Sequence, residues 1–120
     1  MKKLLIVDDS PEVLDGMKRR FGSYCDILAT SDPREAMRIF EEAKPDLVLL
    51  DFDLKDVLNG EDLLKRMKEM SPQVPVAMMT GTRGIRSRLL QEGACAFFDK
   101  SLDDLQRLEA FLRERSILES

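Results

Sequence analysis

The sequence predicts an α/β fold: a doubly wound, five-stranded parallel sheet in the order 2-1-3-4-5, with five helices. Short apolar runs alternate along the chain with longer segments of helical period, which is typical of βα units. One run, residues 47–50, is apolar at every position, as expected for a central strand covered on both faces. Right-handed crossovers between such strands place helices on both faces of one sheet.

The strands are predicted from the apolar runs. The fourth run has Pro75 near its start, where a missing backbone donor is tolerated. The predicted strands are residues 4–7, 26–30, 47–50, 74–79 and 94–98.

The helices are predicted from apolar stripes at helical spacing and from residues that favour helix ends. The third helix is expected over residues 60–70, and Gly93 is placed just after the end of the fourth. Asp32 with Glu35 has the pattern of a capping box. The predicted N-caps are Ser10, Asp32 and Ser101.

The length and composition of the chain limit the classes of protein to which it can belong. A chain of 120 residues fits one core, so residues 1–120 are predicted to form one domain. Lys and Arg do not form a basic stripe with aromatic residues, which argues against direct binding of nucleic acid. No apolar run approaches the ~20 residues of a membrane helix, and residues 4–7 are too short for a signal peptide. The expected location is the cytoplasm.

The chain contains no histidine, which excludes a His-based catalytic triad, histidine ligands to zinc and a phosphohistidine on this chain. Its two cysteines, Cys25 and Cys95, are too few for a disulfide framework and are predicted to be buried thiols in strand regions. Any chemistry must therefore use carboxylates, hydroxyls, lysine and a hard metal ion.

Four of the five predicted strands end at a polar group that could take part in chemistry. Ligands of doubly wound sheets bind beyond the carboxyl ends of the strands, so these groups are expected to gather. A general tendency of loops to be polar would explain any one of these residues. It would not explain why carboxylates follow the two central strands while a hydroxyl group and a cation follow the next two. The residues are Asp8 and Asp9 after the first strand, Asp51 after the third, Thr80 after the fourth and Lys100 after the fifth.

The types of these residues suggest phosphoryl chemistry. Three carboxylates brought together repel one another, and one tends to keep its proton unless a cation binds. Mg²⁺ prefers oxygen ligands and usually takes one or two carboxylates, water and a phosphate oxygen. With Mg²⁺ beside Asp8 and Asp9, Asp51 can be an anionic nucleophile that forms an acyl phosphate. Thr80 and Lys100 would bind the remaining phosphoryl oxygens.

Four segments resemble a known family. They are Leu-Leu-Ile-Val-Asp-Asp-Ser, Leu-Val-Leu-Leu-Asp, Met-Met-Thr-Gly and Gly-Ala-Cys-Ala-Phe-Phe-Asp-Lys-Ser. In this order and spacing, they resemble the receiver domains of response regulators in two-component signalling over the whole chain. The resemblance implies the CheY-like version of the flavodoxin-like fold.

The resemblance also implies a metal site and a phosphorylation site. Asp51 would be the phosphorylated residue. Asp9, Asp51 and the backbone carbonyl of Asp53 would bind Mg²⁺ directly, and Asp8 would act through water.

Further roles implied by the resemblance concern the switch and the partners. Thr80 would be the switch hydroxyl, and Lys100 the counter-ion of the phosphate. Phe97 matches the aromatic residue whose rotamer follows the threonine, with an ordinary core phenylalanine as the alternative.

The donor would be a sensor histidine kinase or phosphotransfer protein. A downstream effector would bind the surface of the fourth helix and fifth strand. A second copy of the chain, in a homodimer, would be a further partner. The chain would catalyse only its own phosphotransfer and autodephosphorylation.

The loop after Asp51 departs from the family pattern. Receivers commonly have a hydrophobic residue followed by proline here, whereas Leu54 is followed by Lys55, and the expected glycine, Gly60, comes one position late. An inserted residue is therefore expected in this loop. Asp53 adds a second acid near the acceptor. Its carboxylate is hypothesised to tighten cation binding and to alter the autodephosphorylation rate, with a solvated loop acid as the alternative.

Two further departures lie near the last strands. The Lys-Pro step of the family is Lys100-Ser101 here. A trans peptide bond is expected, because a cis bond before a non-proline residue costs ~2.5–4 kcal/mol, unless the site enforces cis to aim the lysine. Arg83, Arg86 and Arg88 cluster at the fourth helix, either as a solvated basic face or as part of a partner surface.

Two other functions compete with a phosphorylated receiver. Leu-Val-Leu-Leu-Asp-Phe-Asp-Leu resembles the first motif of haloacid-dehalogenase-type phosphohydrolases, with Asp51 as nucleophile and Asp53 as acid/base. Against this, the acid pair Asp8 and Asp9 comes before the motif, and the downstream acids Asp103 and Asp104 stand in a capping position. The other alternative is a degenerate receiver that acts only as an interaction module.

Overall fold

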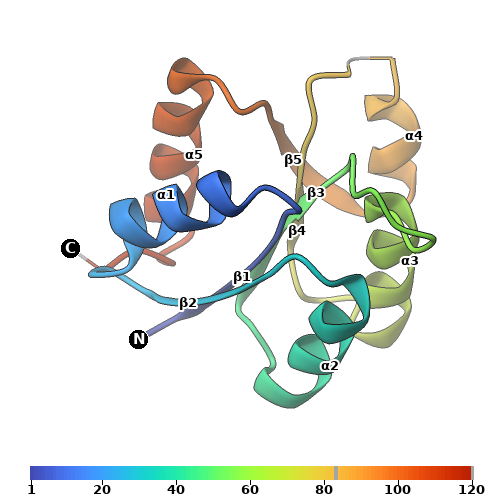
Figure 1. The fold of residues 1–120 in the computed structure, drawn as a ribbon, viewed down its shortest axis with the longest axis horizontal. Helices are drawn as coiled ribbons and strands as arrows, with labels where there is room; N and C mark the ends of the chain where they lie inside the picture. The colour runs from blue at the N-terminus through green and yellow to red at the C-terminus, as the bar shows by residue number, and fades with distance from the viewer. Residues whose placement is uncertain (83, 120) are drawn as a thin grey trace.

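The computed structural model describes residues 1–82 and 84–119. In these residues one parallel sheet has the strand order β2-β1-β3-β4-β5, which confirms the predicted topology (Figure 1). The strands are β1 (Lys3–Val7), β2 (Asp26–Thr30), β3 (Leu47–Asp51), β4 (Val76–Met79) and β5 (Ala94–Phe98). The helices are α1 (Pro11–Phe21), α2 (Pro33–Ala43), α3 (Gly60–Met70), α4 (Arg86–Gln91) and α5 (Leu102–Glu114).

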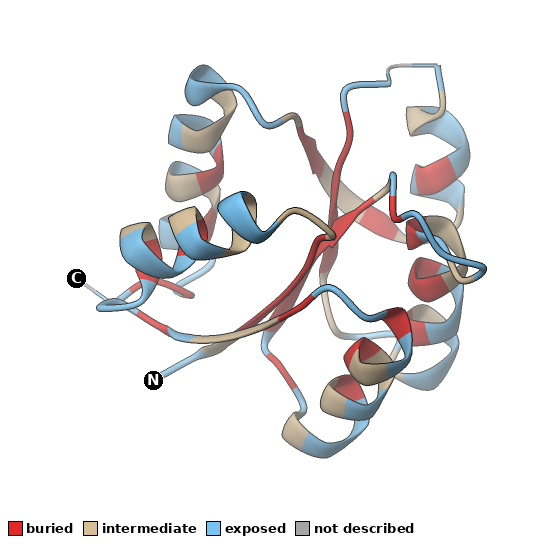
Figure 2. Ribbon diagram, viewed as in Figure 1, coloured by how far each residue is buried: buried red, intermediate tan, exposed pale blue. Residues whose placement is uncertain are grey.

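Helices cover both faces of the sheet and divide the core into two layers. α1 and α5 lie on one face, and α2, α3 and α4 lie on the other (Figure 1). The middle of the sheet is buried from both sides (Figure 2). All five residues of β3 are buried, as the apolar run at its start predicts. None of the helices in the described residues is long and apolar enough to span a bilayer.

The strand register places the ends of β1, β3, β4 and β5 side by side. Val7 pairs with Leu50, so the residue after β1 lies beside the end of β3. Asp51 pairs with Met79, which in turn pairs with Phe98. The segments that follow β1, β3, β4 and β5 therefore begin at the same edge of the sheet.

The helix caps agree only in part with the sequence. Ser10 accepts a hydrogen bond from Val13 N, and Ser101 from Asp104 N, as N-caps should. The capping box expected for Asp32 does not form, because its carboxylate accepts from Arg34 N instead. Pro33, at the first helical position, has no N–H, so Arg34 N is the first free amide of the helix.

Three strand boundaries also differ from those predicted: β1 begins at Lys3, β3 extends to Asp51, and β4 begins later than expected. β4 begins at Val76 rather than at residue 74, because Val74 N donates to Ser71 O in the preceding turn. α4 begins at Arg86 and ends at Gln91, so Gly93 follows the C-cap residue Glu92 as predicted. Gly93 has φ 110°, a left-handed conformation that glycine adopts without steric cost and that suits the end of a helix.

The last described residues turn back onto the body of the domain. Ile117 and Leu118 are buried in the layer formed by α1 and α5, and Glu119 N donates to Tyr24 O at 2.8 Å. We call residues 115–119 the C-terminal clasp. It was not predicted, since the apolar pair Ile117-Leu118 is too short to indicate an element.

The two cysteines are free thiols. Cys25 is buried but lies in the turn before β2 rather than in a strand, whereas Cys95 is in β5 and is only partly buried. Burial raises the pKa of both thiols, so both are less reactive than an exposed cysteine.

Candidate phosphoryl-acceptor site

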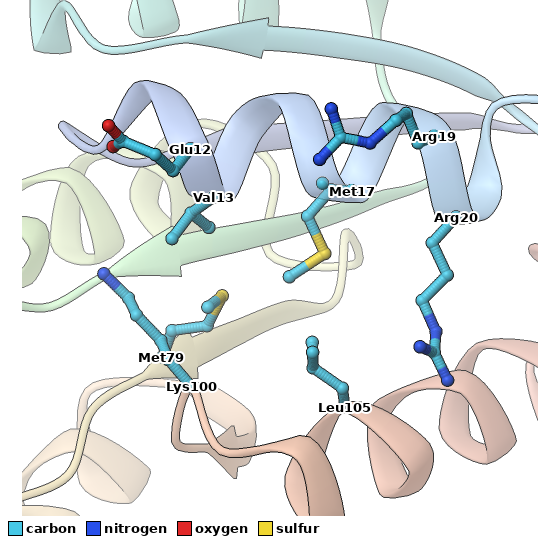
Figure 3. A pocket seen from close by; sticks show the side chains of 9 residues that line it. Glu12, Val13, Met17, Arg19, Arg20, Met79, Lys100 and Leu105 are labelled. Atoms are coloured by element: carbon cyan, nitrogen blue, oxygen red, sulfur yellow. The ribbon is translucent and has the colours of Figure 1, made fainter.

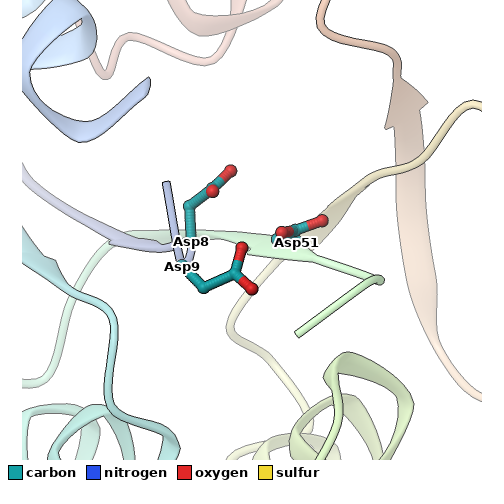
Figure 4. Close-up of side chains that lie close together, drawn as sticks. All are labelled: Asp8, Asp9 and Asp51. Carbon is teal, nitrogen blue, oxygen red and sulfur yellow. The ribbon is translucent and has the colours of Figure 1, made fainter. Parts of the chain in front are cut away.

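Three carboxylates meet at the carboxyl edge of the sheet. Asp8 and Asp9 follow β1, and Asp51 ends β3, so the side chains converge from neighbouring strands (Figure 4). One carboxylate oxygen from each lies within 4.8 Å of those of the other two. Asp8 is fully buried and Asp51 is 2% exposed, whereas Asp9 reaches solvent. The predicted convergence of these residues is confirmed.

Lys100 provides the positive charge of the site. Its Nζ lies 2.9 Å from Asp8 Oδ2 and 3.3 Å from Asp51 Oδ2. Partial burial acts to lower the pKa of Lys100, but the two carboxylates outweigh this and raise the pKa above its ordinary value. The ammonium group is therefore held between the acceptor and its neighbouring acid.

Asp51 is a carboxylate whose ionised form is disfavoured by its surroundings. Burial is the largest cause and raises its pKa, and repulsion from Asp8 raises it further. The N–H of Asp53, 3.0 Å from Asp51 Oδ1, and the ammonium of Lys100 act in the opposite direction. The net effect is a raised pKa, so a further cation would favour the charged nucleophile.

The donor set fits a magnesium ion. All three acidic side chains offer oxygen, and their combined charge exceeds that of Lys100 by two. Asp8 Oδ1 accepts from Ser10 N at 2.8 Å, while Asp8 Oδ2 is buried and has the Lys100 ammonium group, 2.9 Å away, as its partner. Mg²⁺ prefers oxygen ligands and tolerates bound water, which suits a site that opens to solvent at Asp9.

Thr80 lies at the end of β4, next to the strand that carries Asp51. It is buried, its backbone N–H donates to Phe98 O at 2.8 Å, and its hydroxyl accepts from Thr82 N at 3.0 Å. The hydroxyl is thus engaged with its own loop. Phe97, on β5, is buried among apolar residues of the α2–α3–α4 layer.

Asp53 takes part in the site through its backbone and not through its carboxylate. Its N–H contacts Asp51, while its side chain is exposed and does not belong to the acid cluster. Further along the loop, Leu54 packs into the core and Val57 is 86% exposed. Arg34 Nη1 lies 3.9 Å from Asp56 Oδ1, an exposed contact that holds the loop weakly against α2.

The end of this loop is fixed by a feature that was not predicted. Asn59 and Asp62 form a capping box: Asp62 N donates to Asn59 Oδ1, and Asn59 N donates to Asp62 Oδ2. Asn59 three residues before an acid was a signal for it. Gly60 follows directly, and a Cβ atom there would overlap the carbonyl oxygen of Asp51 and lie 2.8 Å from Phe52 Cα. The glycine lets α3 begin against the end of β3.

Two expectations near β5 can be compared with the structure. The described residues contain no cis peptide bond, so Lys100-Ser101 is trans as expected. The arginine cluster is not a uniform solvated face. Arg88 makes a two-pronged ion pair with Glu61 of α3, at 2.9 Å for both contacts, and Arg86 is partly buried. Arg83 lies outside the described residues.

An apolar groove adjoins the site and was not predicted. It lies between α1 and α5, has a volume of about 510 Å³, and includes Lys100 at one end (Figure 3). Met17, Met79 and Leu105 line it, and Gly16 leaves room in its wall, since no atom lies within 4 Å of a Cβ built there.

The comparison with known families identifies the chain. A model of the response regulator receiver domain matches residues 4–113. The chain belongs to the response regulator receiver family. This agrees with the fold and the strand order, and it gives no support to the haloacid-dehalogenase alternative.

Curated relatives of this receiver domain are regulatory proteins. The transcriptional regulatory protein TrcR of Mycobacterium tuberculosis is 32% identical, over 98% of this chain and 48% of its own length. The methanol utilization control regulatory protein MoxX of Paracoccus denitrificans is 29% identical, over 91% of this chain and 51% of its own. The chain spans about half the length of these relatives.

Solved structures of receivers superpose closely on this one. A CheY-like receiver domain protein from Methanospirillum hungatei has a TM-score of 0.81 at 26% identity, covering 96% of both chains. NtrX from Brucella abortus has a TM-score of 0.84 at 26% identity, covering 96% of this chain and 27% of that one. The family places this receiver among signalling proteins of two-component systems.

Proposed function

We propose that this receiver domain accepts a phosphoryl group on Asp51 from the phosphohistidine of a sensor histidine kinase or phosphotransfer protein, in the cytoplasm. The observation that carries the proposal is the setting of Asp51: a nearly buried carboxylate with Lys100 Nζ at 3.3 Å on one side and two further acids within 4.8 Å on the other. An ordinary structural ion pair does not require this excess of acids.

The side chains have separate tasks in the transfer. A carboxylate oxygen of Asp51 bonds to phosphorus, the phosphorus–nitrogen bond of the donor breaks, and the donor imidazole leaves with the electron pair. Lys100 and the hydroxyl of Thr80 bind oxygens of the transferred group. Asp9, Asp51 and the carbonyl of Asp53 would hold Mg²⁺, with Asp8 acting through water, and the ion would supply neutralisation of charge on the phosphoryl oxygens.

The phosphorylated state then differs from the free state mainly in charge. The phosphoryl group adds roughly −1.5 to −2 charge at the edge of the sheet. Thr80 and Lys100 turn toward it, and the surface of α4 and β5 shifts toward one of two existing states. A downstream effector, or a second copy of the chain, binds this surface, and Phe97 reports the change.

Chemical labelling tests the proposal. The protein is incubated with phosphoramidate, a small phosphorus–nitrogen donor, and MgCl₂, and its intact mass is measured. We expect one added phosphoryl group in the wild type, loss of the label on treatment with hydroxylamine, and no label when Mg²⁺ is removed with EDTA. Asp51→Asn should abolish labelling, whereas Asp15→Asn, an exposed change on α1, should leave it intact.

The outcomes separate the alternatives. A label retained in Asp51→Asn would show that another residue is the acceptor. A wild type that stays folded and unlabelled at high donor concentration would favour the degenerate receiver that acts only as an interaction module. Repeated turnover of a small phosphate ester would favour a phosphohydrolase.

A further inference from the structure

Phe97 is contacted by two arginines that come from different helices. The guanidinium carbon of Arg86, the first residue of α4, is 5.5 Å from the centroid of the Phe97 ring. Arg107 of α5 donates from Nη2 to the backbone carbonyl of Phe97 at 3.4 Å. Arg107 therefore contacts the main chain of Phe97, which is held in the sheet. Arg86 contacts the ring of Phe97, and the ring can change its rotamer.

The intrinsic stability of α4 does not explain why residue 86 is an arginine. The N-terminal end of a helix carries partial positive charge, so an arginine there is unfavourable. Ile85, the N-cap residue, offers no side-chain hydrogen bond that would compensate, and α4 has only six residues. The position of Arg86 therefore depends on a tertiary contact.

The polar surroundings of Arg86 leave the ring as its main partner. Arg86 Nε is buried and has no hydrogen-bond partner among the described residues. The nearby acid is Asp104, but its carboxylate already accepts from Asp99 N at 2.7 Å and from Arg107 Nη1 at 2.7 Å. A guanidinium that is partly removed from water gains more from an aromatic face than an exposed one does.

We infer that Arg86 is a positioning residue that holds the Phe97 ring in its buried rotamer and so sets the balance between the two states of the α4–β5 surface. The ring is buried where it makes this contact, and we take the contact to be lost when the ring leaves its buried position. A contact made in one of two states shifts their populations by its own free energy. The inference rests on the proposed function, because the balance matters only if phosphorylation acts on this surface.

The chain offers a matched control for this contact. Arg88 lies two residues later on the same short helix and pairs with Glu61 of α3, and in the part of the chain that the structure describes its guanidinium does not stack on the Phe97 ring. Arg86→Gln and Arg88→Gln remove the same charge from α4, but only the first removes a cation from the ring. Arg86→Lys keeps the charge without the planar group.

The experiment measures the ring directly. A fluorinated phenylalanine is placed at position 97 of the full chain, and ¹⁹F NMR gives the ring populations without any phosphodonor. We expect Arg86→Gln to raise the minor, solvent-exposed population roughly two- to fivefold, as the loss of a cation–π contact predicts. Arg86→Lys should restore part of the wild-type ratio, and Arg88→Gln should not change it.

Two results would overturn the inference. One is an Arg86→Gln protein that is folded by circular dichroism and has the wild-type ring populations. The other is an equal shift in Arg88→Gln, which would assign the effect to the charge of α4 in general. Labelling of Asp51 is measured on the same samples. A change in the ring populations without labelling of Asp51 would support the contact but contradict the proposed function. Labelling of Asp51 with unchanged ring populations in Arg86→Gln would contradict only the inference.

Discussion

Asp51 is held by two donors of different kinds, a backbone amide on one oxygen and an ammonium group on the other. The amide belongs to Asp53, so the loop that begins two residues later helps to orient the acceptor. The ammonium group, Lys100 Nζ, is shared with Asp8. Under the proposed function, binding of Mg²⁺ and transfer of phosphate would both rearrange this shared contact.

Asp53→Asn tests the hypothesis that the loop acid influences the metal. The carboxylate is exposed, so its effect on a nearby cation is screened and modest. We expect Mg²⁺ affinity to fall roughly two- to fivefold, as for other solvent-exposed charge pairs, with a changed lifetime of the acyl phosphate. Calorimetry and the decay of the mass label measure the two quantities. Asp56→Asn, on the same loop, is the control, and an unchanged affinity and lifetime in Asp53→Asn would leave Asp53 as a solvated loop acid.

Asp104 should contribute stability that depends on pH. Its pKa is lowered, first by the hydrogen bond from Asp99 N and then by Arg107. A carboxylate with a lowered folded-state pKa stabilises the fold above its ordinary pKa, and this contribution is lost as the pH falls through the folded-state pKa. We expect Asp104→Asn to cost about 1–2 kcal/mol of unfolding free energy at neutral pH. The difference from wild type should shrink toward zero in acid.

Urea unfolding at a series of pH values measures this effect. Asp103→Asn is the matched control, because Asp103 is exposed on the same turn of α5. A difference between Asp104→Asn and wild type that stays constant from pH 7 down to acid would contradict the electrostatic explanation.

The position of a site residue could be predicted where that residue directly follows the end of a strand. Asp8, Asp51, Thr80 and Lys100 follow from the topology, because their places depend only on where each strand stops. The exposure of the Asp53 carboxylate could not be predicted, since it depends on the path of an atypical loop. The stacking of Arg86 could not be predicted either, because it depends on side-chain rotamers.

At the scale of elements, the start of α3 is pressed against the end of β3. The capping box of Asn59 and Asp62 ends the loop, and Gly60 allows the helix to approach the main chain of Asp51 and Phe52. The structure therefore couples the geometry of one helix terminus to the acceptor. The boundaries of this helix were predicted correctly, although its cap was not.

Gly60→Ala and Gly16→Ala should have opposite effects. A methyl group at position 60 meets backbone atoms that cannot move aside, so we expect a loss of about 1–3 kcal/mol in unfolding free energy and weaker labelling of Asp51. A methyl group at position 16 meets no atom within 4 Å and removes a glycine from the interior of α1. There we expect a gain of about 0.5–1 kcal/mol.

Denaturant unfolding of both variants checks the pair. Equal stability changes in the two would show that close approach at Gly60 is unimportant. Normal labelling in a destabilised Gly60→Ala protein would separate the fold from the position of the acceptor.

At the scale of the whole molecule, the chain ends hold together the edge of the domain opposite β5. The C-terminal clasp lies beyond residue 113, where the match to the family ends, and it packs Ile117 and Leu118 beside α1. Its backbone joins Glu119 to Tyr24 in the turn before β2. The topology of the sheet was predictable from apolar runs and caps, whereas this packing was not, because it involves two residues in an irregular segment.

Ile117→Ala should show that the clasp belongs to the core. Its side chain is 4% exposed, and removing buried methyl groups costs about 2–4 kcal/mol. Thermal and urea unfolding would measure the loss. Glu119→Ala, which removes only an exposed side chain, should change the unfolding free energy by less than about 1 kcal/mol. An Ile117→Ala protein as stable as wild type would mean that the clasp is detached in solution.

The division of the core into two layers separates the neighbours Phe97 and Phe98. Phe97 belongs to the layer under α2, α3 and α4, and Phe98 to the layer under α1 and α5, where its ring lies 5.3 Å from that of Phe111. Successive residues of a strand point to opposite faces. Spectroscopic labels at these adjacent positions would therefore be independent reporters, and their relative response times would show which side of the domain receives the signal first.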